Sequence, residues 1–160
     1  MDAITYTPIG VVRSPWREVA GMPLQSVAAA DVAGTVEVLP EYAEGLRDLD
    51  GFSHLLLLTH LHQVTAARLT VTPFLDTQSH GVFATRSPAR PNPIGLSVVC
   101  LLKVEGTTLH IAGVDLLDGT PVLDIKPYVP TFDVFAAERT GWFAENAAKV
   151  QTIRADDRFR

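Results

Sequence analysis

The stretch Phe52–Gln63, which reads FSHLLLLTHLHQ, predicts the centre of the fold. Successive side chains of a strand point to opposite faces, so a strand here divides its residues into two sets. One face carries His54, Leu56, Leu58, His60 and His62, and the other carries Leu55, Leu57, Thr59, Leu61 and Gln63. Both faces are largely apolar, which is typical of a strand buried on both sides. We expect a central strand with a barrel interior on one side and a helix or a second subunit on the other.

Strand-like runs dominate the sequence on both sides of this stretch. They span Ile4–Arg13, Gly34–Leu39, Leu69–Thr72, Gly81–Thr85, Ile94–Glu105, Leu109–Val114 and Val122–Ile125. Helices do not alternate with these runs, which argues against a parallel sheet built from strand–helix–strand units. The pattern therefore predicts a mainly β protein whose core is a single β-barrel rich in antiparallel pairs.

Helical signals are few. A short helix is expected from Pro40, because proline suits the first position of a helix. A C-terminal helix is expected over Phe132–Val150, with a break near Gly141. We therefore divide the chain into a barrel domain, residues 1–135, and a C-terminal helix and tail of the same domain, residues 136–160.

Length and charge exclude several classes of protein. The chain has 160 residues, which is typical of one domain, and its net charge of −5 argues against a broadly basic nucleic-acid-binding surface. The single cysteine, Cys100, excludes an internal disulfide, and its apolar neighbours predict a buried thiol. The N-terminus shows no signal-peptide pattern, and no apolar stretch approaches the ~20 residues that span a bilayer. We expect a cytoplasmic protein that does not contact a membrane.

Glycine spacing and histidine spacing bear on cofactors. None of the eleven glycines lie two residues apart, which excludes the glycine-rich dinucleotide fingerprint. His60 and His62, together with His54, have a spacing found in metal-binding barrels. No second ligand motif is recognisable, so we favour hydrogen-bonded histidines and expect no metal. A histidine-based, metal-dependent barrel enzyme stays open as an alternative.

The segment Gly81–Gly95, GVFATRSPARPNPIG, predicts a rigid loop that presents two cations. Its three prolines fix φ and favour extended geometry in the residues before them, which excludes a helix. Arg86 and Arg90 offer planar donors suited to carboxylates and phosphates. A stiff loop loses little entropy when a ligand binds. The alternative is a structural turn whose arginines only cap nearby carbonyl groups.

A second loop region carries carboxylates. Asp115, Asp118 and Asp124 lie within a segment that has a tight-turn signal at Asp118–Gly119. These carboxylates could face the arginine-bearing loop. A hairpin with solvated aspartates is the alternative.

Taken together, five blocks of the sequence resemble the TrmO family, also called TsaA-like or YaeB-like proteins. The blocks are IGVVRSPW (Ile9–Trp16), MPLQ (Met22–Gln25), LDGFSHLLLLTHLHQ (Leu49–Gln63), GVFATRSPARPNPIGLS (Gly81–Ser97) and LLDGTPVLDIKPYVP (Leu116–Pro130). They follow the family's order over about 120 residues.

The resemblance implies a barrel-type methyltransferase that uses S-adenosylmethionine. Its acceptor would be N6 of N6-threonylcarbamoyladenosine, beside the anticodon of tRNA. It further implies a homodimer with the cofactor pocket near the subunit interface. Carried over by motif, the cofactor contacts fall on Pro23, Leu24, Gln25, His62, Gln63, Arg86, Leu96, Asp118, Gly119, Thr120 and Pro121.

This chain departs from the family pattern at two places. The residue before the glutamine of the second block is often basic in the family, and here it is Leu24. Better-studied bacterial members continue into a separate C-terminal region that helps hold tRNA, whereas this chain resembles the shorter members. Its basic end, Arg154, Arg158 and Arg160, is either an RNA contact or a solvated tail.

The implied chemistry assigns roles to the charged residues. Methyl transfer from a sulfonium is an in-line displacement, so positioning supplies most of the rate. Candidate general bases are Asp118, Asp124 and Tyr128. Arg86 is expected to face the cofactor, and Arg90 and Lys126 the RNA or the threonyl carboxylate. A protein that binds S-adenosylmethionine but acts on another acceptor, or serves as a sensor, stays open.

Overall fold

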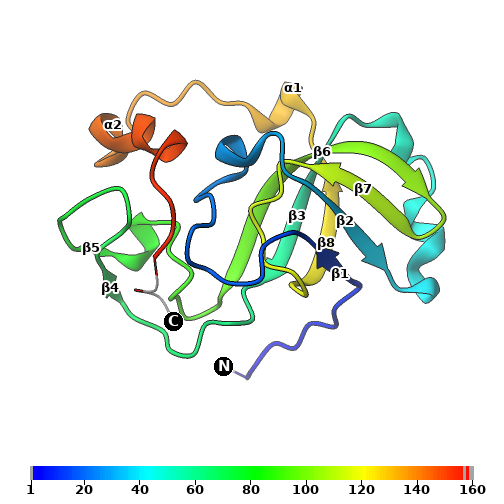
Figure 1. Cartoon of the computed structure of the whole chain (residues 1–160), viewed down its shortest axis with the longest axis horizontal. Helices are drawn as coiled ribbons and strands as arrows, with labels where there is room; N and C mark the ends of the chain where they lie inside the picture. Colours follow the sequence, from blue (N-terminus) through cyan, green and yellow to red (C-terminus); the bar gives the residue numbers. More distant parts are fainter. Residues whose placement is uncertain (1, 157, 159–160) are drawn as a thin grey trace.

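The computed structural model describes residues 2–156 and 158, and its centre is a closed antiparallel barrel (Figure 1). The barrel strands are β1 (Gly10–Arg13), β2 (Ala33–Val38), β3 (His54–His60), β6 (Ile94–Glu105), β7 (Thr108–Ala112) and β8 (Pro121–Pro127). They follow the order β1-β2-β7-β6-β3-β8, and β8 pairs with β1 to close the barrel. The prediction of a mainly β barrel is confirmed.

Strand β3 lies at the centre of the barrel wall, between β6 and β8. Its inward residues Leu55, Leu57 and Thr59 are fully buried, so the predicted parity is right. Leu56 and Leu58 on the outer face are half-buried and both flanking histidines are exposed. Burial on both sides is therefore only partial, and the outer face is half covered.

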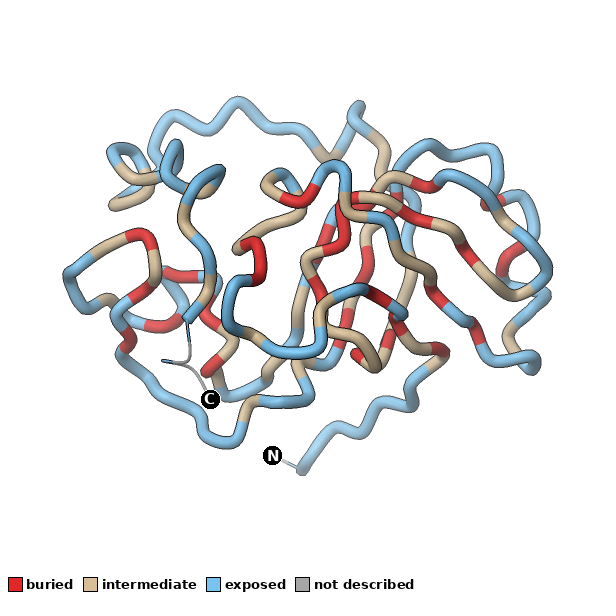
Figure 2. The backbone as a smooth tube through the Cα atoms, viewed as in Figure 1, coloured by how far each residue is buried: buried red, intermediate tan, exposed pale blue. Residues whose placement is uncertain are grey.

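Alternating burial along the other barrel strands builds one core (Figure 2). Its fully buried members include Val12, Val36, Val99, Leu109 and Ile111. Each such side chain contributes about 1.5–3 kcal/mol by leaving water. Strand β1 begins at Gly10 rather than Ile4, because its partner β2 ends at Val38 and the chain turns away there.

Short helices close one end of the barrel and follow its last strand. The 3₁₀ helices η2 (Pro40–Leu46) and η3 (Leu49–Gly51) insert Leu46 and Leu49 into the core, which confirms the short helix expected from Pro40. A single helical turn, α1 (Pro130–Asp133), follows β8.

The C-terminal helix is present but shorter than expected. It consists of α2 (Phe143–Asn146) and η5 (Ala147–Gln151), and residues 134–142 are irregular. Val134 and Phe135 are 61% and 81% exposed, so no surface packs against this stretch to hold a helix. Gly141 has φ +58°, which breaks the helix where the sequence placed a break. None of the helices among the described residues is long and apolar enough to cross a membrane.

A smaller lobe stands beside the barrel and carries the C-terminal helix (Figure 1). It contains the strand pair β4 (Thr70–Val71) and β5 (His80–Gly81), and the 3₁₀ turn η4 (Val82–Ala84) in place of the strand expected over 81–85. Val71, Val82 and Ala89 form its small core. The last described residues pair with the loop that precedes η1 (Ser26–Ala29), since the Ala155 N–H donates to Met22 O at 2.9 Å.

Candidate functional site

A pocket of about 1630 Å³ lies between the barrel and the smaller lobe. Three segments form its walls: the loop 22–30 that contains η1, the loop 81–95 with the start of β6, and the C-terminal segment 140–155. We call these walls the η1 loop, the proline loop and the C-terminal wall. Asp115, Leu116 and Thr120, which precede β8, form part of the lining from the barrel side.

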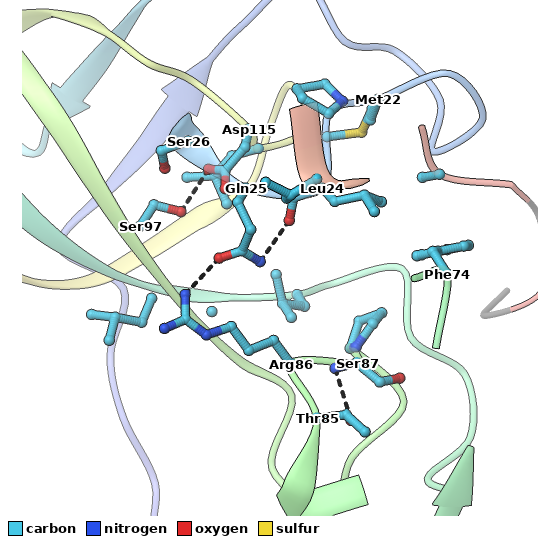
Figure 3. A pocket seen from close by; sticks show the side chains of 18 of the residues that line it. Met22, Leu24, Gln25, Ser26, Phe74, Thr85, Arg86, Ser87, Ser97 and Asp115 are labelled. Carbon is cyan, nitrogen blue, oxygen red and sulfur yellow. Dashed lines mark hydrogen bonds between the residues drawn. The ribbon is translucent and has the colours of Figure 1, made fainter. Parts of the chain in front are cut away.

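Two predicted cofactor contacts meet across this pocket. The Arg86 guanidinium donates through Nη1 to Gln25 Oε1 at 2.6 Å, and Gln25 Nε2 donates to Leu24 O at 2.6 Å (Figure 3). The proline loop and the η1 loop are 61 residues apart in sequence, so this bond joins two separate walls. Since Arg86 is exposed, its remaining donors are available to an anion.

The proline loop is braced by its own polar groups. Thr85 and Ser87 are 5% and 6% exposed, and Thr85 Oγ1 accepts the Ser87 N–H at 3.2 Å. The Arg90 N–H donates to Pro88 O at 2.7 Å. Arg90 Nη1 lies 3.4 Å from Thr85 O, so its side chain partly caps the loop as the alternative interpretation expected. These contacts hold the loop in one shape.

Gly95 lets the proline loop enter β6 against the barrel wall. A Cβ at this position would lie 2.6 Å from Thr59 Oγ1 and 2.9 Å from Leu61 Cδ2. Thr59 is fully buried, and its hydroxyl has no hydrogen-bond partner among the described residues. The close contact between Gly95 and Thr59 of β3 therefore fixes the position at which the proline loop joins β6.

Asp115 lines the pocket and was not among the predicted site residues. Its Oδ1 accepts a hydrogen bond from Ser97 Oγ at 2.7 Å (Figure 3). Burial raises the pKa of its carboxyl group, and hydrogen bonds from Ser97 and Ser26 oppose that rise without cancelling it. The sequence signal for Asp115 was its place in the predicted carboxylate segment, but the resemblance directed attention to Asp118.

Most of the predicted cofactor contacts share this pocket. Eight of them line it: Pro23, Leu24, Gln25, His62, Gln63, Arg86, Leu96 and Thr120. The predicted acceptor contact Arg90 also lines it. Three others, Asp118, Gly119 and Pro121, are not among its lining residues.

The three candidate bases lie away from the pocket of their own chain. Asp118 forms an ion pair with Arg17 and accepts the Ser14 N–H at 3.1 Å, beside a second, shallow groove. Asp124 pairs with Lys126 at 2.7 Å on β8. The Tyr128 ring packs edge-on against a histidine ring of β3, 6.3 Å between centroids.

His54 and His60 are the first and last residues of β3, and His54 and His62 line the pocket. Strand β3 stops at His60, so His62 lies in the turn after the strand rather than on its face. Burial lowers the pKa of His62, and the neighbouring His60 lowers it further. No group of three or more histidine, cysteine, aspartate or glutamate side chains able to hold a metal ion occurs within residues 2–156 and 158. Cys100, expected to be buried, is half-buried and lines the pocket.

The C-terminal wall was missed by sequence reasoning. Trp142 stacks on His80 and Phe143, with centroids 4.7 Å and 3.8 Å away, and its Nε1 donates to Ala84 O at 2.8 Å. In the basic end, Arg158 packs 4.9 Å above the Phe74 ring, while Arg160 lies outside the described residues. A helix pattern alone cannot show which residues such a helix will meet.

Comparisons with known proteins agree on one group of relatives. Residues 11–134 match the tRNA-methyltransferase O N-terminal domain. A protein of Pyrococcus abyssi named as a probable S-adenosyl-L-methionine-binding protein is 53% identical over 98% of this chain and 85% of its own length. The tRNA (adenine(37)-N6)-methyltransferase of Escherichia coli is 41% identical over 81% of this chain.

Solved structures of longer relatives share the fold. The crystal structure of TrmO from Pseudomonas aeruginosa superposes with a TM-score of 0.74 at 43% identity, over 88% of this chain. The matched part covers 63% of that protein and 60% of the Escherichia coli enzyme. The chain therefore spans about three fifths of these two relatives.

Proposed function

The chain belongs to the tRNA-methyltransferase O N-terminal domain family, and from this premise we propose that it is a methyltransferase dependent on S-adenosylmethionine. Its proposed acceptor is N6 of N6-threonylcarbamoyladenosine beside the tRNA anticodon. The observation that carries the proposal is the Arg86–Gln25 bond inside the large pocket, because it joins two walls through residues that the family resemblance assigns to the cofactor.

The donor set of the pocket fits S-adenosylmethionine. This cofactor combines an adenine ring, a ribose, a sulfonium and an amino-acid end. The lining offers a guanidinium at Arg86, an amide at Gln25, a carboxyl at Asp115 and apolar side chains such as Leu24 and Leu96. The volume exceeds the roughly 300–1,000 Å³ of usual small-molecule sites, which leaves room for an acceptor base.

The residues would act mainly by positioning. Bound S-adenosylmethionine supplies an activated methyl group on its sulfonium, so the protein needs no nucleophile. Holding two reactants in line is worth on the order of 7–11 kcal/mol. A base that accepts the N6 proton would add roughly 10²- to 10⁴-fold, and Asp118, Asp124 and Tyr128 keep this proposed role.

Several of the proposed cofactor contacts require a second protomer. Asp118, Gly119 and Pro121 do not line the pocket of their own chain, so their proposed contact with the cofactor needs a partner copy. The outer face of β6 offers a surface for one, because Leu96, Val98 and Leu102 are 58%, 38% and 60% exposed. Exposed apolar patches of this kind are typical of subunit interfaces. We propose a homodimer that places the pocket near its interface.

The acceptor would contact the two cations that have no proposed role in cofactor binding, Arg90 and Lys126. Arg90 lines the pocket and is suited to the threonyl carboxylate. Lys126 lies at the far end of β8, paired with Asp124, and is suited to a tRNA phosphate. Neither role requires a broadly basic surface.

A second candidate function deserves a test, since several relatives are named only for binding S-adenosylmethionine. Such a protein would bind the cofactor and act on another acceptor, or act as a sensor. Cofactor binding with no methyl transfer to modified tRNA would favour this candidate.

Calorimetry with Arg86→Ala tests the cofactor site directly. Loss of a charge-assisted hydrogen bond is expected to weaken S-adenosylmethionine binding roughly 10- to 100-fold. Arg47→Ala removes an exposed arginine that does not line the pocket and should leave binding unchanged. Unchanged affinity in Arg86→Ala would remove Arg86 from the cofactor site.

A further inference from the structure

Asp115 is a carboxylate enclosed in the pocket, and no catalytic step above uses it. Among the described lining residues it is the one acidic side chain, facing a pocket whose permanent cations are Arg86 and Arg90. Figure 3 shows Asp115 and Arg86 on two sides of the pocket, with Gln25 between them. The pocket thus presents opposite charges from two of its sides.

The partners of Asp115 are neutral. Ser97 Oγ donates to Oδ1 at 2.7 Å and Ser26 adds further hydrogen bonds, while no cation of the described residues forms an ion pair with this carboxylate. A carboxylate has about four acceptor sites, so the serines leave acceptor capacity unused. A half-buried carboxylate without a cationic partner has lost part of its hydration, and a cationic ligand would compensate for that loss.

Arg86 supplies the complementary charge. Its guanidinium is held by Gln25, and Figure 3 shows Gln25 reaching from the side of Asp115 toward Arg86. A carboxylate on one side and a guanidinium on the other match an α-amino acid, which carries an ammonium and a carboxylate on one carbon. The two opposite charges therefore suit a zwitterion better than a single ion.

We propose that Asp115 and Arg86 form a subsite for the α-amino-acid end of the ligand, with Asp115 binding the α-ammonium and Arg86 the α-carboxylate. The assignment rests on the proposed function, in which the cofactor ends in such a group. Asp115 meets the ammonium rather than the sulfonium because an ammonium donates three hydrogen bonds and a sulfonium donates none. Ser97 and Ser26 hold the carboxylate in place for that contact.

Binding should also favour release of a proton from the Asp115 carboxyl group. Burial raises the pKa of Asp115 in the free protein, and an ammonium beside it would lower that pKa again. The other titratable or charged side chains that line the pocket are His54, His62, Arg86 and Arg90. Because the arginines stay charged and Asp115→Asn retains both histidines, the variant isolates the contribution of Asp115 to proton release.

Calorimetry with three ligands tests the subsite. S-adenosylmethionine and S-adenosylhomocysteine both carry the zwitterion, whereas 5′-methylthioadenosine lacks it. Asp115→Asn should weaken binding of the first two by a similar factor, roughly 10- to 100-fold, and leave the third unchanged. Titrations at mildly acidic pH in buffers of different ionisation enthalpy should show more proton release in the wild type than in the variant. Asp31→Asn, an exposed aspartate with the same change in charge, should alter nothing.

The outcomes separate the proposal from the proposed function. Weaker binding of S-adenosylmethionine alone would place Asp115 at the sulfonium, and equal weakening of all three ligands would make its role structural; either overturns the proposal. Unchanged binding in Asp115→Asn overturns it while cofactor binding stands. A wild-type protein that binds none of the three overturns the proposed function as well. If Asp115→Asn fails to fold, Ser97→Ala should weaken only the two zwitterionic ligands, by a few-fold, and unchanged affinities there would overturn the proposal.

Discussion

Gly95 leaves no space between the proline loop and the barrel wall. Alanine at this position would bring a Cβ to 2.6 Å from Thr59 Oγ1 and 2.9 Å from Leu61 Cδ2. Because Thr59 is fully buried on a central strand, we expect Gly95→Ala to lower the free energy of unfolding by about 1–3 kcal/mol. Urea denaturation measures it. Gly45→Ala, whose Cβ would meet nothing within 4 Å, is the control and should be neutral or stabilising. Equal effects at both glycines would contradict the packing argument.

Asp115 gives the folded chain a specific pH dependence. Since burial raises its pKa above the ordinary value of 3.8, the folded state binds a proton more tightly than the unfolded state. Its contribution to the free energy of unfolding therefore falls as pH rises from about 3.8 through the raised pKa, and the full loss persists above it. The difference in unfolding free energy between wild type and Asp115→Asn, measured across that range, should change in this direction. A difference that is flat with pH would contradict it.

The sequence predicted many of the residues that line the pocket, but it did not single out the acidic one, Asp115. Arg86 and Gln25 were both expected at the cofactor and they bond to each other, because the motifs that carry them are long and specific. Asp115 and Asp118 lie in one carboxylate-rich segment, and only the family resemblance favoured Asp118 over Asp115. Their partners separate them, because Asp115 accepts a hydrogen bond from Ser97 of β6 and lines the pocket, whereas Asp118 pairs with Arg17. No local sequence pattern reveals those contacts.

The C-terminal wall contacts the smaller lobe through the aromatic side chain of Trp142. Trp142 joins it to the smaller lobe through the His80 stack and the bond to Ala84 O. We expect Trp142→Ala to increase amide hydrogen exchange across residues 143–151 while the barrel strands keep their protection. Phe135→Ala, at a position 81% exposed, should leave exchange unchanged. Unaltered exchange over 143–151 in Trp142→Ala would show that other contacts hold the wall.

Elements were predicted well where burial follows a period and poorly where it does not. The alternation along β3 divided its residues into the correct two faces, and the structure shows that Leu55, Leu57 and Thr59 form the inner one. The expected helix over 132–150 contains apolar residues at helical spacing, yet its first half finds no surface to pack against and stays irregular. Strand β1 is short for a related reason, since its partner strand ends first.

For the whole molecule, we expect two copies of the chain to associate through the outer face of β6. Leu102→Arg places a charge on that face, so we expect sedimentation to show a shift from dimer toward monomer. Leu69→Arg is the control, since Leu69 has a similar exposure, 69% against 60%, and lies on the smaller lobe. A wild-type protein that is monomeric at high concentration would contradict the proposed homodimer and the contacts assigned across it.

The proposed activity is methyl transfer to a modified tRNA base. The direct measurement incubates the full chain with S-adenosylmethionine labelled in its methyl group and with tRNA that carries N6-threonylcarbamoyladenosine, beside the same tRNA without the modification. We expect labelled methyl groups in the modified tRNA alone, and we expect this labelling to be lost in Arg86→Ala. Intact cofactor binding with no label in either tRNA would contradict it and identify the chain as a protein that binds S-adenosylmethionine for another purpose.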